Sequence, residues 1–132
     1  MSKDLITSLC DELGFAWSEE GERPLLRIAV PPSIEIEFEL GERGGEMRVL
    51  LAPLPEEGRE VVLSHLMQAN YLGQGTGGGV LGIAEDSRSF TFSRRLQRDI
   101  GSKELQERIE EFVNYAEYWR EQLENGSISH SR

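Results

Sequence analysis

The stretch Ile34-Glu35-Ile36-Glu37-Phe38-Glu39-Leu40 decides the fold, because apolar and acidic residues alternate in it without exception. Such alternation predicts a β-strand with one buried face and one face toward solvent. Another strand is predicted before it at 25–30, where Pro31-Pro32 ends the pairing, and another after it at 47–52. Three consecutive strands joined by short turns indicate an antiparallel meander.

Helices are predicted on both sides of this meander, because apolar residues recur there at three- and four-residue steps. The predicted helices cover 2–13, about 56 to 72, and about 102 to 123. Further strands are predicted at 80–84 and 89–96, separated by a turn. The resulting order, α-β-β-β-α-β-β-α, favours an α+β fold in which helices flank a twisted antiparallel sheet.

The boundaries of these elements follow from a few residues. Gly14 stands where a helix C-cap is expected, and Glu56 and Glu57 suit the positively polarised first turn of the middle helix. With 132 residues, the chain is expected to form one domain over 1–124. The polar stretch 125–132 is expected to fray.

The charge balance limits the partners that the protein can bind. The chain has 14 Lys and Arg against 24 Asp and Glu, a net charge of −10. Nucleic-acid binding is not expected, because phosphates are bound by clustered Lys and Arg, and an anionic membrane surface would repel the chain. A single cysteine, Cys10, allows no internal disulfide, and no apolar run is long enough to span a bilayer. The N-terminus lacks a signal-peptide core, so we expect the protein to remain in the cytoplasm.

No pattern in the sequence indicates catalysis, a cofactor or a metal. The glycines at 73, 75 and 78 match a dinucleotide fingerprint by letter, but that fingerprint needs a strand before it and a helix after it. Here a helix is predicted before the glycines and a strand after them, which favours a tight helix-to-strand link. A nucleotide-binding enzyme remains an alternative that only these glycines motivate. His65 and His130 have no further ligands at metal-site spacing. The glutamates at 35, 37 and 39 are best explained as the solvated face of a sheet.

The predicted middle helix is apolar on more than one side. Val62, Leu66 and Ala69 form one side, whereas Leu63, Met67 and Tyr71 are displaced from it. A helix this broadly apolar is buried on more than one side, so one side can face the sheet and the other a partner subunit.

Two segments resemble a known family. The stretch 66–83, LMQANYLGQGTGGGVLGI, and the stretch 90–96, FTFSRRL, resemble the class I chaperones of type III secretion, a family that includes the Tir chaperone. The resemblance implies the same α-β-β-β-α-β-β-α fold and a small, acidic homodimer of the bacterial cytoplasm. It also implies that the protein is no enzyme and has no cofactor.

The resemblance also implies two surfaces. The N-terminal segment of a secreted effector is expected to bind in extended form in grooves made by the first helix and the sheet, which keeps it soluble and competent for secretion. The candidate groove residues, which could equally be core, are Leu5, Ile6, Leu9, Ile34, Ile36 and Phe38. The candidate homodimer residues on the middle helix are Val62, Leu63, Leu66, Met67, Asn70 and Tyr71.

Two questions about partners stay open at this point. A domain of the same fold could serve outside secretion as an adaptor or regulator that binds a folded partner. The sequence also leaves open whether the protein contacts the secretion ATPase, and it does not identify the effector.

Overall fold

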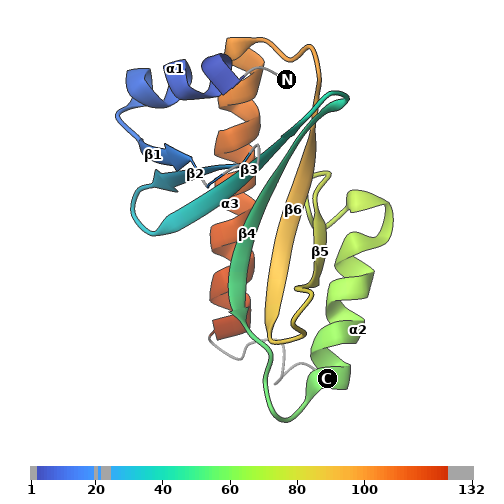
Figure 1. Ribbon diagram of the computed structural model, residues 1–132. Helices are drawn as coiled ribbons and strands as arrows, with labels where there is room; N and C mark the ends of the chain where they lie inside the picture. The colour runs from blue at the N-terminus through green and yellow to red at the C-terminus, as the bar shows by residue number, and fades with distance from the viewer. Residues whose placement is uncertain (1–2, 20, 22–24, 125–132) are drawn as a thin grey trace.

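The computed structural model describes residues 3–19, 21 and 25–124, which form three helices around one antiparallel sheet (Figure 1). The helices are α1 (Lys3–Leu13), α2 (Arg59–Asn70) and α3 (Ser102–Glu124), and a short 3-10 turn, η1 (Tyr71–Gly73), follows α2. The strands are β1 (Ala16–Glu19), β2 (Leu25–Val30), β3 (Ile34–Gly41), β4 (Gly44–Pro53), β5 (Val80–Ile83) and β6 (Ser89–Gln97). The tail predicted to fray, 125–132, lies outside the described residues.

The sheet has the order β1-β2-β3-β4-β6-β5, and every pair of neighbouring strands is antiparallel. This confirms the predicted α+β class and the meander around 34–40. The element order differs by one strand, because no strand was predicted at 16–19. All four residues of β1 are exposed, so they carry no alternation of buried and exposed positions that could have revealed a strand.

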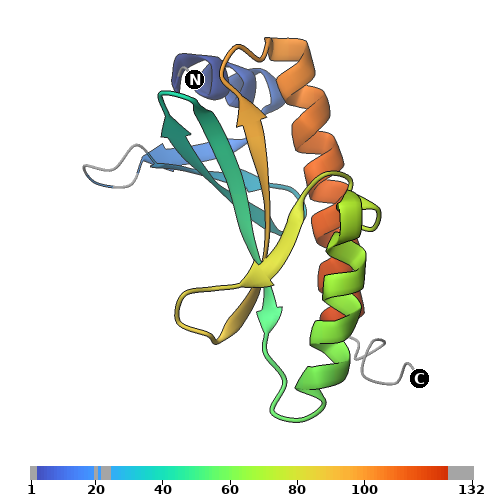
Figure 2. The same ribbon diagram turned by 90° about the vertical axis from the view of Figure 1, so that its right-hand side faces the viewer.

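The helices cover one face of the sheet and leave the other open. Figures 1 and 2 show α3 lying along the back of the sheet and α2 beside β5 on the same side, while α1 packs at one end against α3 and β1. The inward side chains of β3, β4 and β6 meet α3 in the core, where the rings of Phe92 and Phe112 stack with their centroids 4.9 Å apart. The exposed face of the sheet is therefore available for other contacts.

Two glycines set helix boundaries. Gly14 has a φ of +76°, and the amide of Phe15 donates to the carbonyl of Cys10 at 2.9 Å, which closes α1 as predicted. Gly58 has a φ of +74°, outside the helical range. Helix α2 therefore begins at Arg59, later than Glu56 and Glu57 indicated.

Candidate interaction surfaces

The end of α2 is joined to β5 by the side chain of Asn70. Its Nδ2 donates to the carbonyl oxygen of Leu81 at 2.8 Å, and the amide of Leu81 donates to its Oδ1 at 2.8 Å. The side chain thus pairs with the N–H and the C=O of one residue, as a residue on a neighbouring antiparallel strand would. Asn70 was predicted at a dimer contact; the structure places its amide on β5 of its own chain, and the dimer role stays a prediction.

The glycine-rich link between α2 and β5 is closely packed. A Cβ at Gly77 would lie 2.3 Å from the ring of Tyr115, and one at Gly79 would lie 2.6 Å from the ring of Phe92. The buried Thr76 hydroxyl donates to the carbonyl of Gly79 at 2.7 Å. These glycines are therefore required by close approach to α3 and β6, as expected for a tight helix-to-strand link.

Helix α2 has a buried side and an exposed apolar side. Val62 and Leu66 are each only 4% exposed and belong to the core, although they were predicted at the dimer contact. Met67 is 73% exposed and Tyr71 is 66% exposed, and Leu63 is half-buried beside them. We call the exposed side the α2 face; its residues are Glu60, Leu63, Ser64, Met67, Gln68 and Tyr71, so one carboxylate lies at its start.

Leu72, which directly follows the α2 face, combines exposure with an unfavourable backbone. Its φ is +55° and its side chain is 79% exposed. A left-handed conformation costs a residue with a Cβ roughly 1–2 kcal/mol, and such strain tends to occur at functional sites. An exposed leucine held in this conformation is a further sign that the end of α2 is a contact surface.

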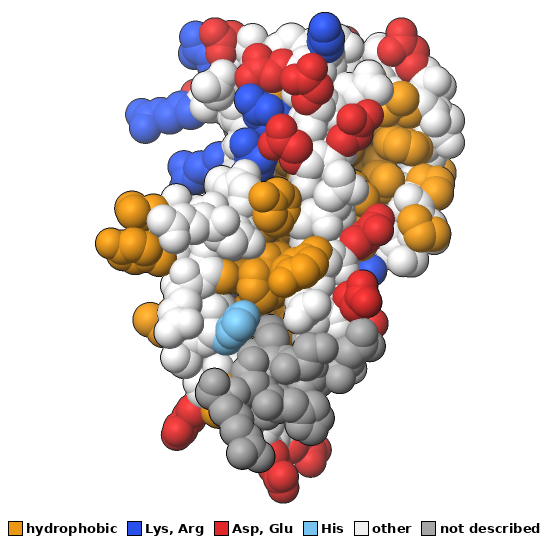
Figure 3. All heavy atoms as spheres, turned by 180° about the vertical axis from the view of Figure 1, so that it is seen from behind, with side chains coloured by type: hydrophobic (Ala, Val, Ile, Leu, Met, Phe, Trp, Pro, Cys, Tyr) orange, Lys and Arg blue, Asp and Glu red, His pale blue; other side chains and the backbone are white. Residues whose placement is uncertain are grey.

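A hollow of about 650 Å³ lies between α2, the glycine-rich link and α3. We call it the aromatic hollow; it is lined by His65, Gln68, Ala69, Gln74, Gly75, Asn114, Tyr115, Tyr118 and Trp119. Figure 3 shows hydrophobic side chains gathered beside His65, the one described histidine, with charged side chains around them.

The wall of the aromatic hollow is held in place by Trp119. Its Nε1 donates to the carbonyl of Gly75 at 3.0 Å, and its ring meets the ring of Tyr118 edge to face at 5.2 Å. The ring of His65 also meets the ring of Trp119 edge to face, with the two ring centroids 6.0 Å apart. The hollow is therefore an aromatic surface whose lining contains no Asp, Glu, Lys or Arg.

Sequence reasoning missed the aromatic hollow, yet one signal pointed to it. No Asp, Glu, Lys or Arg occurs from Val61 to Ala84, although 29% of the chain is charged. Uncharged stretches of this kind are typical of surfaces that other molecules cover, because the centres of protein interfaces are depleted in charge.

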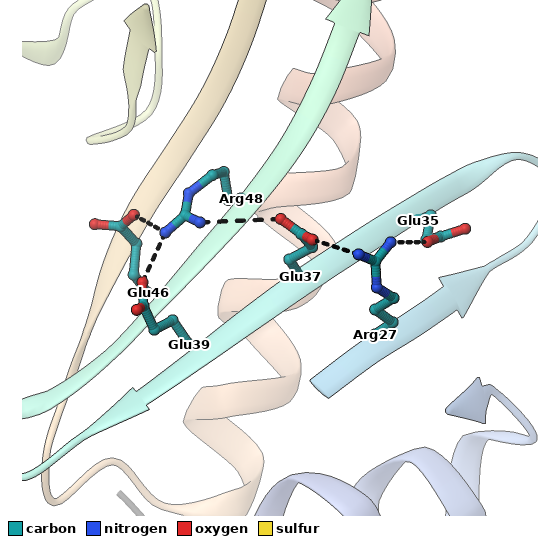
Figure 4. Close-up of polar contacts among 6 residues, drawn as sticks. All are labelled: Arg27, Glu35, Glu37, Glu39, Glu46 and Arg48. Carbon is teal, nitrogen blue, oxygen red and sulfur yellow. Dashed lines mark hydrogen bonds and ion pairs between the residues drawn. The ribbon is translucent and has the colours of Figure 1, made fainter. Parts of the chain in front are cut away.

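The open face of the sheet carries a ladder of ion pairs (Figure 4). Arg48 Nη2 lies 2.8 Å from Glu39 and 2.9 Å from Glu46, and Arg27 Nη2 lies 3.2 Å from Glu37. The hydrogen bond with Glu46 raises the pKa of Arg48, against the opposing effect of burial. The predicted solvated glutamate face is confirmed, with arginines placed between the carboxylates.

Beside this ladder the open face is apolar. Leu50 on β4 is 58% exposed and Val80 on β5 is 56% exposed. Leu50 pairs with Thr91 and Val80 pairs with Ser93, so both point to the same side of the sheet as those two β6 residues. Ile83, at the end of β5, is also exposed, but it pairs with the buried Phe90, so the register places it on the opposite side of the sheet from Leu50 and Val80. We call Leu50 and Val80 the open-face patch.

The candidate groove residues lie mostly inside the domain. The side chains with at most 2% exposure are Ile6, Leu9, Ile34, Ile36 and Phe38, and Leu5 is half-buried. They belong to the core in this single chain. Their role in effector binding therefore stays a prediction.

Cys10 is buried beside these core residues. Burial raises the pKa of its thiol to about 11, with a further contribution from Asp11. The thiol is therefore protonated at neutral pH and behaves as a small apolar side chain.

The described residues contain no cluster of three or more His, Cys, Asp or Glu side chains that could hold a metal ion. Within the same part of the chain, no helix is both long and apolar enough to cross a membrane.

Comparison with known families gives one match. The model of the Tir chaperone protein (CesT) family matches residues 46–120, from β4 into α3. A comparison with curated proteins finds none that matches this sequence.

Solved structures show where the fold recurs. The HopA1-SchA chaperone-effector complex contains a chain that is 14% identical with a TM-score of 0.68, over 90% of this chain and 92% of that chain. The ExoU-SpcU complex of the type III secretion system of Pseudomonas aeruginosa contains a chain that is 16% identical, with a TM-score of 0.68. The likeness covers 89% of this chain and 93% of that chain. YbjN from E. coli is 11% identical, with a TM-score of 0.66. The likeness covers 95% of this chain and 93% of the YbjN chain. At these identities the likeness establishes the fold alone.

Proposed function

Since this chain belongs to the Tir chaperone protein (CesT) family, we propose that it is a type III secretion chaperone. We propose further that it binds the N-terminal segment of a secreted effector. The bound segment is held in extended form, which shields its apolar side chains and keeps it competent for secretion. The family match is the observation that carries this proposal, and the chemistry of the exposed surfaces supports it. We propose no catalytic activity and no cofactor.

The open-face patch is the surface that best suits an extended apolar segment. Leu50 and Val80 are exposed without any rearrangement of the chain. A separate place for such a segment is the outer edge of β1, at the opposite end of the sheet from β5, because among the described strands β1 pairs with β2 alone. An extended segment can satisfy its backbone at a strand edge while its alternate side chains fill apolar pockets.

The candidate groove residues could contact an effector only after the domain opens. Ile6, Leu9 and Phe38 are buried in the core, so an effector that contacts them must first open the packing of α1. We retain Leu5, Ile6, Leu9, Ile34, Ile36 and Phe38 as proposed effector-binding residues on that condition. A segment that uses only the open-face patch would leave α1 in place.

We further propose that the protein acts as a homodimer in the bacterial cytoplasm and that the α2 face forms the contact between subunits. Met67 and Tyr71 are exposed, and their exposure to water is unfavourable in a single chain. Of the candidate dimer residues, Leu63, Met67 and Tyr71 are available for direct contact, whereas Val62 and Leu66 support the face from beneath. A contact with the secretion ATPase is left open.

Fluorescence anisotropy with labelled N-terminal peptides of candidate effectors tests the chaperone proposal. Binding should occur with peptides taken alone and should weaken at least tenfold in Leu50→Asp, which places a charge in the open-face patch. A matched control is Val61→Asp, which changes an exposed valine on α2, away from the patch. Absence of binding by every peptide would contradict the proposal.

An adaptor that binds a folded partner is the second candidate function. The likeness to YbjN, a protein provisionally assigned as a transcription regulator, is the observation that favours it. Under this function the intact partner binds and its isolated N-terminal peptide does not. The anisotropy experiment, repeated with intact partner proteins, therefore separates the two functions.

A further inference from the structure

The turn between β5 and β6 forms one side of a pocket on the open face of the sheet. The pocket has a volume of about 680 Å³, and its lining includes Glu37, Glu39, Arg48, Leu50, Glu85 and Asp86. We call it the turn pocket. Strands β3 and β4 contribute the first four of these residues, and the turn contributes the other two. Leu50 is therefore shared between the turn pocket and the open-face patch.

The charges in the turn pocket do not cancel. Its lining contains four carboxylates and one guanidinium, that of Arg48. This guanidinium already contacts three carboxylates of the sheet (Figure 4), namely Glu39 at 2.8 Å, Glu46 at 2.9 Å and Glu37 at 3.9 Å. Its positive charge is therefore shared within the sheet, and an excess of negative charge remains in the pocket.

The two carboxylates of the turn face the pocket without a cation. Among the residues that the structure describes, neither Glu85 nor Asp86 forms an ion pair, and both are exposed. Asp86 Oδ1 accepts the amide of Arg88 at 2.9 Å, but the guanidinium of Arg88 is not part of the lining. These carboxylates can therefore bind a cation that another molecule supplies.

A lysine or arginine side chain matches both parts of the turn pocket. Such a side chain has an apolar stem, which packs on apolar surface, and a charged head. Leu50, which is 58% exposed, can hold the stem, while Glu85 and Asp86 can hold the head. The net charge of −10 also attracts a basic segment and repels an acidic one. The pocket therefore fits a basic side chain better than a purely apolar one.

We propose that the turn pocket receives a lysine or arginine side chain of the extended segment that lies on the open face. This assignment rests on the chaperone function proposed above, and it adds the charge of the effector segment. Alternate side chains of an extended segment point the same way. A basic residue in the pocket and an apolar residue two positions away therefore both face the sheet, where Val80 offers further apolar contact.

NMR titration of the whole chain with synthetic peptides tests the pocket. The lysine peptide is acetyl-Gly-Ser-Lys-Ser-Leu-Ser-Val-Ser-Gly-amide, which presents lysine, leucine and valine on one side when it is extended. Two matched peptides carry glutamate or leucine in place of the lysine. At low ionic strength the lysine peptide should bind about tenfold more tightly than the glutamate peptide, because only the latter meets like charge. It should shift the amide signals of Leu50, Glu85 and Thr91.

Three results of this titration would overturn the proposal. The first is a glutamate or leucine peptide that binds as tightly as the lysine peptide. The second is a set of shifted amide signals confined to other surfaces. The third is a lysine peptide that does not bind at millimolar concentration.

Charge changes in the turn test which residues select the basic side chain. Glu85→Lys should weaken binding of the lysine peptide about fivefold and strengthen binding of the glutamate peptide. Asp86→Asn should weaken the lysine peptide about twofold, because it removes the charge but keeps an oxygen for the amide of Arg88. The matched control is Glu117→Lys, at an exposed position of α3, which lies along the back of the sheet.

All three positions are exposed, so the variants should fold, and circular dichroism checks this. Equal weakening by Glu85→Lys and Glu117→Lys would overturn the proposal, because only the net charge of the protein would then act.

The effector peptides of the anisotropy assay separate this proposal from the chaperone function. If they bind the wild type, and Glu85→Lys weakens them no more than Glu117→Lys does, the chaperone function stands and the selection of a basic side chain is overturned. If none of them binds, the chaperone function is contradicted, and the lysine peptide still decides whether the turn pocket takes a basic side chain.

Discussion

Asn70 and Leu81 are joined by two hydrogen bonds of 2.8 Å that run in opposite directions, from side chain to peptide and from peptide to side chain. This pair fixes the end of α2 to β5, and both surfaces assigned above depend on it. The α2 face precedes Asn70 in the chain, and Val80 of the open-face patch adjoins Leu81.

Asn70→Asp should destabilise the protein by about 2 kcal/mol, because a carboxylate accepts but cannot donate and would face the carbonyl of Leu81. Asn70→Ala should cost about 1–2 kcal/mol, since the N–H and the C=O of Leu81 both lose the Asn70 amide as a partner. Urea denaturation at one protein concentration measures these changes. Val61→Ala, at an exposed position of α2 outside the α2 face, is the control, and an equal loss there would contradict the assignment.

Gly77→Ala should destabilise the protein by more than about 2 kcal/mol, because the added methyl meets the Tyr115 ring at a φ of +60°. Gly101→Ala provides the matched control, since a Cβ there has nothing within 4 Å and its φ is not positive. Thermal unfolding of the two variants should differ clearly. Similar melting temperatures would show that the link is not tightly packed.

Arg120→Lys should cost about 2 kcal/mol, because the arginine donates to three separate carbonyls and one ammonium group cannot reach them all. Its guanidinium donates to Leu51 at 3.1 Å, Ser33 at 3.1 Å and Leu50 at 2.6 Å. The pairing of β4 with β6 shifts register between Leu50 and Ala52, so the carbonyls of Leu50 and Leu51 lie where the ladder is irregular.

The control for Arg120 is Arg108 on the same helix, which pairs with Glu104 and Glu111 near the surface. Arg108→Lys should change the free energy of unfolding by less than about 0.5 kcal/mol. Equal effects at the two positions in urea denaturation would mean that the three backbone contacts contribute nothing specific.

The contribution of Cys10 to stability should decrease at alkaline pH. Its pKa is raised from 9.0 to about 11 in the fold, so the unfolded thiol ionises first as the pH rises. Between these values the unfolded state binds fewer protons, and the free energy of unfolding falls by at most about 1.4 kcal/mol per pH unit. The difference between wild type and Cys10→Ala should therefore be constant below pH 8 and shrink toward pH 11. A difference that stays constant to pH 11 would mean that the thiol is not buried in solution.

The order of apolar and polar residues predicted those helices and strands that have one buried side and one exposed side. The alternation at 34–40 identified β3, and Gly14 identified the end of α1. Strand β1 was missed because all four of its residues face solvent, so its pairing with β2 leaves no trace in the sequence.

The surfaces were harder to predict than the elements. Ile36 and Phe38 satisfied the pattern expected of a groove, but the same pattern describes a core strand, and they are fully buried. The aromatic hollow depends on Trp119 and His65, which lie far apart in the sequence and come together only through packing of α3 beside α2. Only the absence of charge between Val61 and Ala84 marked this region in advance.

The glycine-rich link also constrains how homologous sequences can diverge. Each glycine whose added Cβ would fall within 3 Å of a neighbour faces a different element: Gly75 faces Ala69 of α2, Gly77 faces Tyr115 of α3, and Gly79 faces Phe92 of β6. A homologue with a smaller residue in place of Tyr115 would have space for a side chain at 77, but the φ of +60° there admits few residues besides glycine and asparagine. We therefore expect position 77 to change from glycine to asparagine only together with a smaller residue at 115.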